Sequence, residues 1–210
     1  MDLKVRDRTD EELFARKNEF LQICNILDYF NIRYFLQTGI LLGAIRDNDF
    51  IKWDWDIEIS VFSNDLLPHI DSIVKKLEKN KFKILTINKK KKDSKIDFIG
   101  EYPKNVTCYT IFSWNYSKIK DLYWRRERSV PSKFLNNLSK ISFFGREFNC
   151  PRNPEEYLVF AYGNWKKPLR TSDKELYMTR NFRNKIKYLI INIKGDFLKI
   201  IYRIWKLLKK

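Results

Sequence analysis

Three carboxylates alternate along residues 51–61, in the stretch Ile51-Lys-Trp-Asp-Trp-Asp-Ile-Glu-Ile-Ser-Val61. If this stretch is a strand, Asp54, Asp56 and Glu58 share one face at intervals of ~6.6 Å, and the apolar side chains between them face the core. Acidic residues are depleted in strands and close like charges repel, so folding alone does not require this row. A divalent cation would remove the repulsion, and carboxylate oxygens suit Mg²⁺ or Mn²⁺. The alternative is the solvated face of a strand.

A turn with two glycines precedes the acidic row, in Thr38-Gly-Ile-Leu-Leu-Gly-Ala-Ile-Arg46. We expect it to connect a short strand at residues 33–37 to a short helix that ends near Arg46. Backbone N–H groups at such a turn and at a helix N-terminus bind phosphates. Acids that hold Mg²⁺ beside a phosphate-binding turn make a site for phosphoryl or nucleotidyl transfer, which is the arrangement of the nucleotidyltransferase fold.

This combination resembles a known family. The pattern Gly-x-Leu-Leu-Gly-x-x-Arg, followed by Ile-x-Trp-Asp-x-Asp-Ile-Glu, is similar to that of the LicD / fukutin-related phosphotransferases. The similarity continues through Cys150-Pro151, Pro154-Glu-Glu-Tyr-Leu158, Tyr162-Gly-Asn-Trp165 and Pro168, so it covers roughly residues 30–170. Two motifs in the right order are much more specific than either one alone.

The resemblance implies a metal-dependent transferase with a nucleotidyltransferase fold. Its members move a phospho-alcohol, such as phosphocholine or an alditol phosphate, from a CDP-linked donor to a hydroxyl of a glycan such as lipopolysaccharide. The implied metal ligands are Asp54, Asp56 and Glu58, of which the two aspartates are also catalytic. The implied donor-phosphate contacts are Gly39, Gly43 and Arg46.

Three positions depart from the family pattern. Ile40 stands where the family has a hydroxyl residue, and Thr38 is the side chain that can substitute for it. Glu58 is longer than the usual aspartate, and Lys52 replaces a frequent proline. These departures leave the identity of the donor open.

Further site residues are expected outside the row. Nucleotidyltransferase folds place a third acid on a neighbouring strand, and Asp97 interrupts an apolar strand pattern at residues 96–99. Asp97 would complete the metal shell or take the proton of the acceptor hydroxyl; the alternative is an exposed residue of an edge strand. Tyr162 and Trp165 either contact the substrate or close the domain by packing.

The composition favours one globular domain with a basic appendage. The chain has 210 residues, 44% of them hydrophobic, and a formal net charge of +16, which calls for an anionic partner. Cys24, Cys108 and Cys150 are far apart in the sequence, which fits a reducing compartment. No stretch approaches the ~18 apolar residues of a membrane span, and the first residues lack the apolar core of a signal peptide. We therefore expect a cytoplasmic protein.

The elements expected form an α+β domain over residues 1–170, a mixed sheet flanked by helices. Capping patterns and apolar periodicity predict helices at 10–30, at 65–79 and from Asn153 to Gly163. Strands are expected at 82–87, 96–99, 106–114 and 141–148, and residues 115–140 are unassigned.

A basic helical extension is expected over residues 171–210. Residues 185–210 hold eight Lys or Arg against one Asp. From Phe197 to Leu208, apolar residues including Trp205 share one helical face. Such a helix suits an anionic membrane surface, which would place the enzyme peripherally on the inner face of the membrane beside a lipid-linked acceptor. The alternative is a helix packed on the domain.

Two other functions are compatible with parts of the sequence. A nucleotidyltransferase would transfer NMP from an NTP and release pyrophosphate. A basic protein without enzymatic activity would bind nucleic acid or a membrane, with a steep salt dependence in the case of nucleic acid. The acidic row beside the phosphate turn argues against nucleic acid as a partner.

Overall fold

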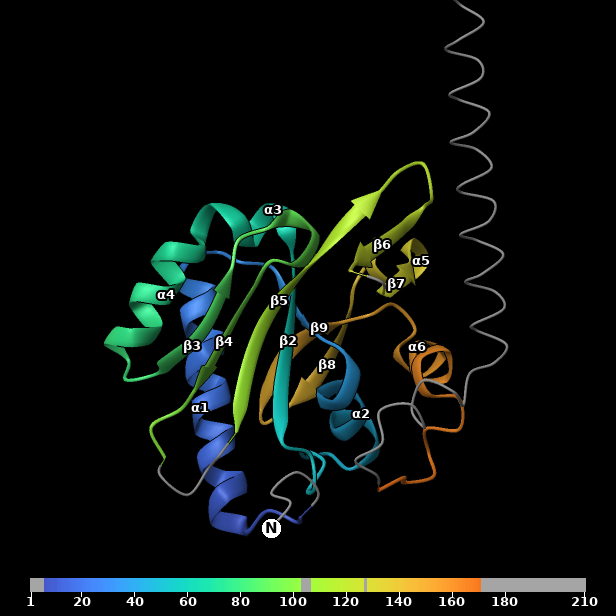
Figure 1. Ribbon diagram of the computed structural model, residues 1–210. Coiled ribbons are helices and arrows are strands. Elements are labelled where there is room, and N and C mark those ends of the chain that lie inside the picture. Colours follow the sequence, from blue (N-terminus) through green and yellow to red (C-terminus); the bar gives the residue numbers. More distant parts are fainter. Residues whose placement is uncertain (1–5, 103–106, 127, 171–210) are drawn as a thin grey trace, which may run out of the picture.

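The computed structural model describes residues 6–102, 107–126 and 128–170. These residues form an α+β domain around a mixed sheet, as predicted (Figure 1). In chain order the elements are α1 (Asp10–Tyr29), β1 (Tyr34–Leu36), α2 (Thr38–Arg46), β2 (Asp56–Phe62), α3 (Ser63–Leu66), η1 (Leu67–His69), α4 (Ile70–Lys79), β3 (Lys83–Asn88), η2 (Lys91–Asp93), β4 (Lys95–Ile99), β5 (Cys108–Ser117), β6 (Leu122–Arg125), β7 (Arg128–Pro131), α5 (Ser132–Leu135), β8 (Ser139–Phe143), β9 (Arg146–Cys150) and α6 (Pro154–Tyr162).

The first helix, α1, begins at the predicted capping box. Thr9 Oγ1 accepts a hydrogen bond from the Glu12 N–H (3.2 Å), and Glu12 Oε2 accepts one from the Thr9 N–H (2.9 Å). Two N–H groups that have no partner within the helix are thereby satisfied. The helix ends at Tyr29, as the sequence predicts within a residue.

The main sheet has seven strands, in the order β1-β2-β5-β4-β3, and β6 and β7 extend it from β5. Strands β2 and β5 are parallel, and the other neighbours are antiparallel. Strands β3, β4 and β5 confirm three of the predicted strands to within a few residues. The sheet therefore has the acidic strand β2 in its interior, with β1 on one side and β5 on the other.

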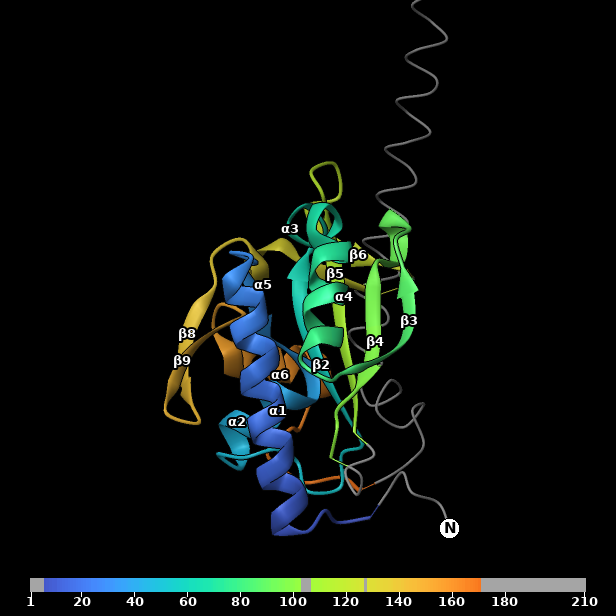
Figure 2. The same cartoon turned by 90° about the vertical axis from the view of Figure 1, so that its left-hand side faces the viewer.

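The two faces of the sheet differ in chemistry. Ile57, Ile59 and Ile111 are buried on the face toward α1 and α4, which lie on the same side of the sheet (Figure 2). Alternate residues of the same strands point to the opposite face. We call this opposite face the acid face; it carries Asp56, Glu58, Thr110 and Asp97.

An aromatic cluster fixes α1 from its other side. The Phe20 ring lies 5.8 Å from that of Phe50 and 5.4 Å from that of Phe148, measured between centroids. Phe148 belongs to the hairpin β8–β9, so α1 lies between this hairpin and the main sheet (Figure 2). The cluster holds α1 in place against β2 and β5.

The sequence prediction of one strand over residues 141–148 was wrong. The chain turns back at Phe144 and Gly145, which have φ values of 50° and 76°. Two consecutive residues with positive φ are the requirement of a two-residue type I′ hairpin. The result is the hairpin β8–β9, in which Phe143 pairs with Arg146.

The predicted helix over residues 65–79 is divided. Pro68 has no N–H to donate, and the chain forms the short α3 and η1 before α4 begins at Ile70. Helix α6 confirms the prediction for residues 154–162 and ends at Gly163. Asn153, however, has a φ of 51° and makes no side-chain cap bond.

The division at residue 170 and the expected basic helix at residues 171–210 lie outside the described residues. Within the described residues, no helix has the length and apolar character needed to cross a bilayer. Residues 115–140, unassigned from the sequence, form β6, β7 and α5.

Glu12 gives a testable pH dependence of stability. Its carboxylate pairs with Arg6, with Nη1 at 2.7 Å, and the hydrogen bonds from Arg6 and Thr9 lower the pKa of Glu12 from 4.5 to about 2. This contribution to stability is present above pH 4.5 and is lost as the pH falls toward 2. We expect Glu12→Gln to unfold with a shallower dependence on pH over that range, measured as the urea midpoint.

The matched control is Glu11→Gln, which changes an exposed glutamate of the same helical turn. It should keep the wild-type dependence. If the urea midpoint depended on pH equally steeply in wild type and in Glu12→Gln, the prediction would be contradicted.

Candidate active site

Strand β2 begins at Asp56, so the prediction of a strand from residue 51 was wrong. The reason is that no strand of the described residues pairs with residues 51–55. Strand β1 pairs only with residues 59–61, and β5 begins at Cys108, opposite Asp56. Asp54 lies instead in a turn, in which its N–H donates to the carbonyl of Ile51 at 3.0 Å. Trp53 and Trp55 are only half-buried and do not extend the apolar face of the strand.

The Asp54 carboxylate packs against Gly39, the second residue of α2. A Cβ atom placed on Gly39 would lie 2.6 Å from Asp54 Oδ2, closer than a real contact. Asp54 Oδ1 accepts a hydrogen bond from the Trp55 N–H at 3.0 Å, and the Asp54 side chain is hydrogen-bonded to that of Asp56. Burial raises the pKa of Asp54, while nearby Arg16 and the hydrogen bond with Asp56 act against the rise. The two aspartates form a close carboxylate pair at the helix N-terminus.

Thr38 connects the glycine turn to the acidic row. Its hydroxyl donates to Glu58 Oε2 at 3.2 Å, and its backbone has a φ of 55°, which is rare for a β-branched residue. Thr38 therefore touches a carboxylate of the acid face.

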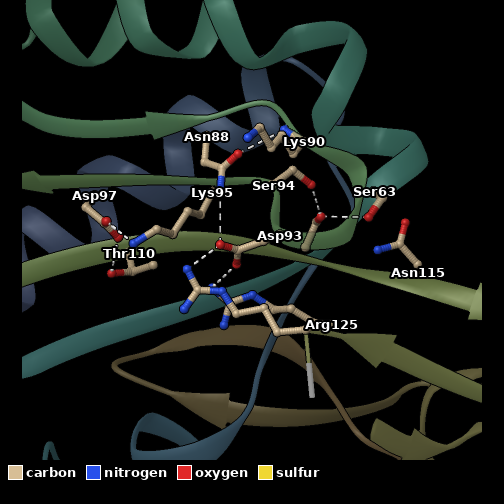
Figure 3. A network of polar contacts seen from close by, with 12 residues as sticks. Ser63, Asn88, Lys90, Asp93, Ser94, Lys95, Asp97, Thr110, Asn115 and Arg125 are labelled. Atoms are coloured by element: carbon tan, nitrogen blue, oxygen red, sulfur yellow. Dashed lines mark hydrogen bonds and ion pairs between the residues drawn. The ribbon is translucent and has the colours of Figure 1, made fainter. Parts of the chain in front are cut away.

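Asp97 lies farther from the acidic row than predicted. Its backbone aligns with Thr110 of β5, and Thr110 aligns with Glu58, so one whole strand separates Asp97 from β2. Strand β4 is internal, which excludes the alternative of an edge-strand residue. Asp97 Oδ1 accepts a hydrogen bond from Thr110 Oγ1 at 2.9 Å, and Asp97 Oδ2 pairs with Lys95 (Figure 3).

Gly43 and Arg46 lie farther along α2. A Cβ atom on Gly43 would lie 2.5 Å from the carbonyl oxygen of Asp49, so this glycine permits close packing of the helix on the following loop. Arg46 ends the helix, roughly 12 Å along its axis from Thr38 at 1.5 Å per residue. Its Nη2 pairs with Asp47 at 2.7 Å. The Arg46 guanidinium lies over the ring of Trp53, the residue before Asp54, with Cζ 5.9 Å from the ring centroid.

Trp165 and Tyr162 belong to the core around α6. Trp165 is buried and Tyr162 is half-buried against the same cluster. Their placement agrees with the packing alternative. The neighbouring Tyr157 is also buried, and its hydroxyl lies beside the side chain of Gln37, the residue that precedes Thr38.

Two buried arginines were missed from the sequence. Arg16 of α1 donates from Nη2 to the carbonyl oxygen of Asp54 at 2.9 Å. Arg125 of β6 lies over the ring of Phe112, 4.3 Å from its centroid, and pairs with the buried Asp93 at 3.1 Å (Figure 3). The charge of Glu58 acts on Arg125, which places this arginine at the acid face. Neither residue stands in a recognisable motif.

The donor set fits a divalent cation that is shared with a substrate. Among residues 6–102, 107–126 and 128–170, no three His, Cys, Asp or Glu side chains form a ligand group, so Asp54, Asp56 and Glu58 are not gathered as three ligands. Mg²⁺ commonly binds proteins through one or two carboxylates and completes its shell with water and substrate phosphates. The Asp54–Asp56 pair, lying against the N-terminus of α2, suits this mode.

A family model for the LicD/FKTN/FKRP nucleotidyltransferase domain matches residues 31–153, more than half of the chain. The chain belongs to the LicD/FKTN/FKRP family. The matched residues run from just before β1 to the residue before α6, so they include the carboxylate pair, the glycine turn and Asp97. The family resemblance is confirmed over residues 31–153, which include the first motif; the second motif, from Pro154 onward, lies beyond the matched residues.

Individual relatives agree with this assignment. Ribitol 5-phosphate transferase FKRP from Mus musculus and from Homo sapiens is 25% identical over 156 residues, which are 67% of this chain and 30% of FKRP. The uncharacterized protein RP689 of Rickettsia prowazekii (strain Madrid E) is 27% identical over 166 residues, covering 76% of this chain and 59% of that protein. The LicD-family chain thus spans about 30% of the length of FKRP.

One solved structure shares the fold. The solution structure of the antibiotic-resistance factor ANT(2″)-Ia has a TM-score of 0.50 at 12% identity and covers 94% of this chain and 98% of its own. The lincosamide antibiotic adenylyltransferase LnuA has a TM-score of 0.49 at 16% identity, with coverage of 85% and 97%. Together with the family match, the first of these confirms a nucleotidyltransferase-like fold.

Substitutions at the two glycines of α2 distinguish an effect on the cation site from an effect on the stability of the fold. We expect Gly39→Ala to retain its unfolding temperature, because alanine favours the helix and the new Cβ atom displaces only a carboxylate. Its affinity for Mn²⁺, measured by electron paramagnetic resonance of the free ion, should fall at least tenfold, on the order of other displaced metal-site contacts.

Gly43→Ala is the matched control in the LicD-family chain. Its Cβ atom meets backbone atoms of the loop, so it should lower the unfolding temperature, by on the order of 1–3 kcal/mol of stability, through overpacking. Equal Mn²⁺ affinity in Gly39→Ala and wild type would show that Asp54 does not bind the ion.

Proposed function

We propose that this LicD-family chain is a metal-dependent phosphotransferase. It moves a phospho-alcohol, of the phosphocholine or alditol-phosphate class, from a CDP-linked donor to a hydroxyl group of a glycan. The observation that carries the proposal is the half-buried Asp54–Asp56 pair against the N-terminus of α2. The ribitol 5-phosphate transferase activity of FKRP supports the class of reaction.

The proposed reaction displaces CMP from the donor. The acceptor hydroxyl oxygen forms a bond to the β-phosphorus while the bond from that phosphorus to the bridging oxygen breaks, and CMP leaves with the bridging oxygen. A Mg²⁺ or Mn²⁺ ion, when bound, neutralises the diphosphate and the charge that develops on the leaving oxygen.

The chain's own residues hold and orient the reactants. Asp54 and Asp56 provide the carboxylates for the ion, and the N–H groups at the start of α2, near Gly39, orient a donor phosphate. Asp97, which pairs with Lys95, is the proposed acceptor of the hydroxyl proton. Thr38 holds Glu58 at the edge of the donor site.

The proposed cellular place is the cytoplasmic face of a membrane. The basic residues of 185–210 would bind anionic headgroups and bring the domain close to a lipid-linked glycan acceptor. This part of the proposal rests on the sequence of the extension.

Nucleotide binding tests the proposal. We expect CDP or CTP, in the presence of Mn²⁺, to raise the unfolding temperature of wild type, because both bring a diphosphate to the cation. GDP and UDP should give smaller shifts, and Asp56→Asn should abolish the metal-dependent shift while its unfolding temperature without nucleotide stays near that of wild type. Turnover of a CDP-alcohol should fall below detection in the same variant.

Asp71→Asn is the matched control, since Asp71 is exposed on α4 and pairs with Lys89 away from the acid face. It should behave as wild type. The absence of any metal-dependent shift with cytidine nucleotides would refute the proposal, and release of pyrophosphate from CTP in place of CMP from a CDP-alcohol would indicate a nucleotidyltransferase.

A further inference from the structure

Asp54 lies outside the sheet, so the strand ladder does not hold it. The backbone of Asp56 is in register with Cys108, whereas the turn at residues 51–55 lies before the first paired residue of β2. A carboxylate that binds a cation must be held within about 0.5 Å of its working position. Some other contact must therefore fix the backbone of this turn.

Two hydrogen bonds hold this turn: the Arg8 N–H donates to the carbonyl of Lys52 at 2.8 Å, and Arg16 makes the contact at Asp54 itself. The Arg16 guanidinium donates from Nη2 to the carbonyl oxygen of Asp54 at 2.9 Å and from Nε to Thr107 Oγ1 at 3.1 Å. Thr107 immediately precedes β5, so one side chain links α1, the Asp54 turn and the start of β5. Phe50 packs on the guanidinium, with its ring centroid 5.8 Å from Cζ.

The position of Arg16 is unusual for a purely structural residue. Its side chain has 0% exposure, and both hydrogen bonds go to neutral oxygens. Burying a guanidinium without an ionic partner is costly. Burial accordingly lowers the pKa of Arg16, while the side chains of Tyr109, Asp54 and Asp56 act in the opposite direction. The carboxylate pair therefore contributes to compensating this buried cation, together with Tyr109.

We propose that Arg16 is a positioning residue for the cation site. One of its hydrogen bonds goes to the Asp54 carbonyl and the other to Thr107, so it fixes the Asp54 turn against the start of β5 and holds the carboxylate pair together before the metal binds. This inference rests on the proposed function, because it concerns the same cation. It assigns a role in the site to a helix whose sequence pattern indicates only packing.

Two simpler roles predict different behaviour. If Arg16 acted only as a nearby positive charge, its removal would raise the affinity for a cation, because a repulsive charge is lost. If it only filled the core, Arg16→Lys would change stability and leave the affinity for the cation unchanged. A positioning role predicts weaker binding in both kinds of variant.

The experiment measures Mn²⁺ affinity by electron paramagnetic resonance of the full chain for wild type, Arg16→Lys and Arg16→Met. Lysine keeps the charge but has a single nitrogen, which cannot reach both acceptors in the fork geometry of arginine. We expect Arg16→Lys to bind Mn²⁺ about tenfold more weakly and Arg16→Met up to about 100-fold more weakly, the usual range for residues that orient metal ligands. Unfolding temperatures in EDTA verify that each variant is folded.

Arg146→Lys is the matched control. Arg146 also links separate elements, since it donates to Asn25 of α1 (3.0 Å) and to the Tyr34 hydroxyl of β1 (2.7 Å), but it does not touch the Asp54 turn. It should keep the wild-type affinity for Mn²⁺. Unchanged binding in a folded Arg16→Lys, or tighter binding in Arg16→Met, would overturn the inference; if Arg16→Met does not fold, Arg16→Lys decides.

The same measurements distinguish a failure of the proposed function from a failure of the inference on Arg16. If wild type bound Mn²⁺ no better than Asp56→Asn, there would be no cation site at Asp54 and Asp56, and both proposals would fall. If wild type bound Mn²⁺ through Asp56 and Arg16→Lys bound it equally well, only the inference on Arg16 would fall.

Discussion

The site depends on holding two carboxylates together where the sheet begins. Asp54 and Asp56 repel each other when both are charged, and the pKa of Asp54 is raised by burial. The surrounding elements supply what opposes this repulsion: Arg16 from α1 at the Asp54 carbonyl, the Trp55 N–H at its carboxylate, and Gly39 of α2, which leaves room for it. The aromatic cluster around Phe20 holds α1 in place and so acts on the site as well.

A second constraint joins the two sequence motifs, which are about 100 residues apart in the chain. Gln37, immediately before the glycine turn, is fully buried, and its Oε1 accepts hydrogen bonds from Ser60 Oγ (2.7 Å) and Trp114 Nε1 (2.8 Å). Tyr157 of α6 lies beside the same side chain. Gln37 thus ties β2, β5 and α6 to the start of α2. Tyr157 of the second motif thus lies beside the residue that precedes the glycine turn, and Trp165 of the same motif is buried in the core.

The sequence predicted local features well and long-range contacts poorly. The capping box of Thr9, the glycine turn and the alternation along β2 each depend on residues close together in the sequence, so they could be predicted. The glycine turn and the acidic row also carried the family resemblance. The start of β2 was wrong because it depends on where β5 begins, and the strand at 141–148 was wrong because the turn needs positive φ at Phe144. Arg16 could not be found, since its partners are 38 and 91 residues away.

The distribution of cations on the acid face distinguishes its carboxylates from one another. Lys95 pairs with Asp97, and Arg125 lies within electrostatic range of Glu58, so positive side chains already act on these two acids. The charge of Arg16 likewise acts on Asp54, but its hydrogen bond goes to the backbone carbonyl of Asp54, while the Trp55 N–H donates to Asp54 Oδ1. Asp97, in contrast, is paired directly with a lysine ammonium group. Under the proposed function, an exchangeable ion would therefore gain more at Asp54 than at Asp97, because the Asp97 carboxylate already has a cationic partner.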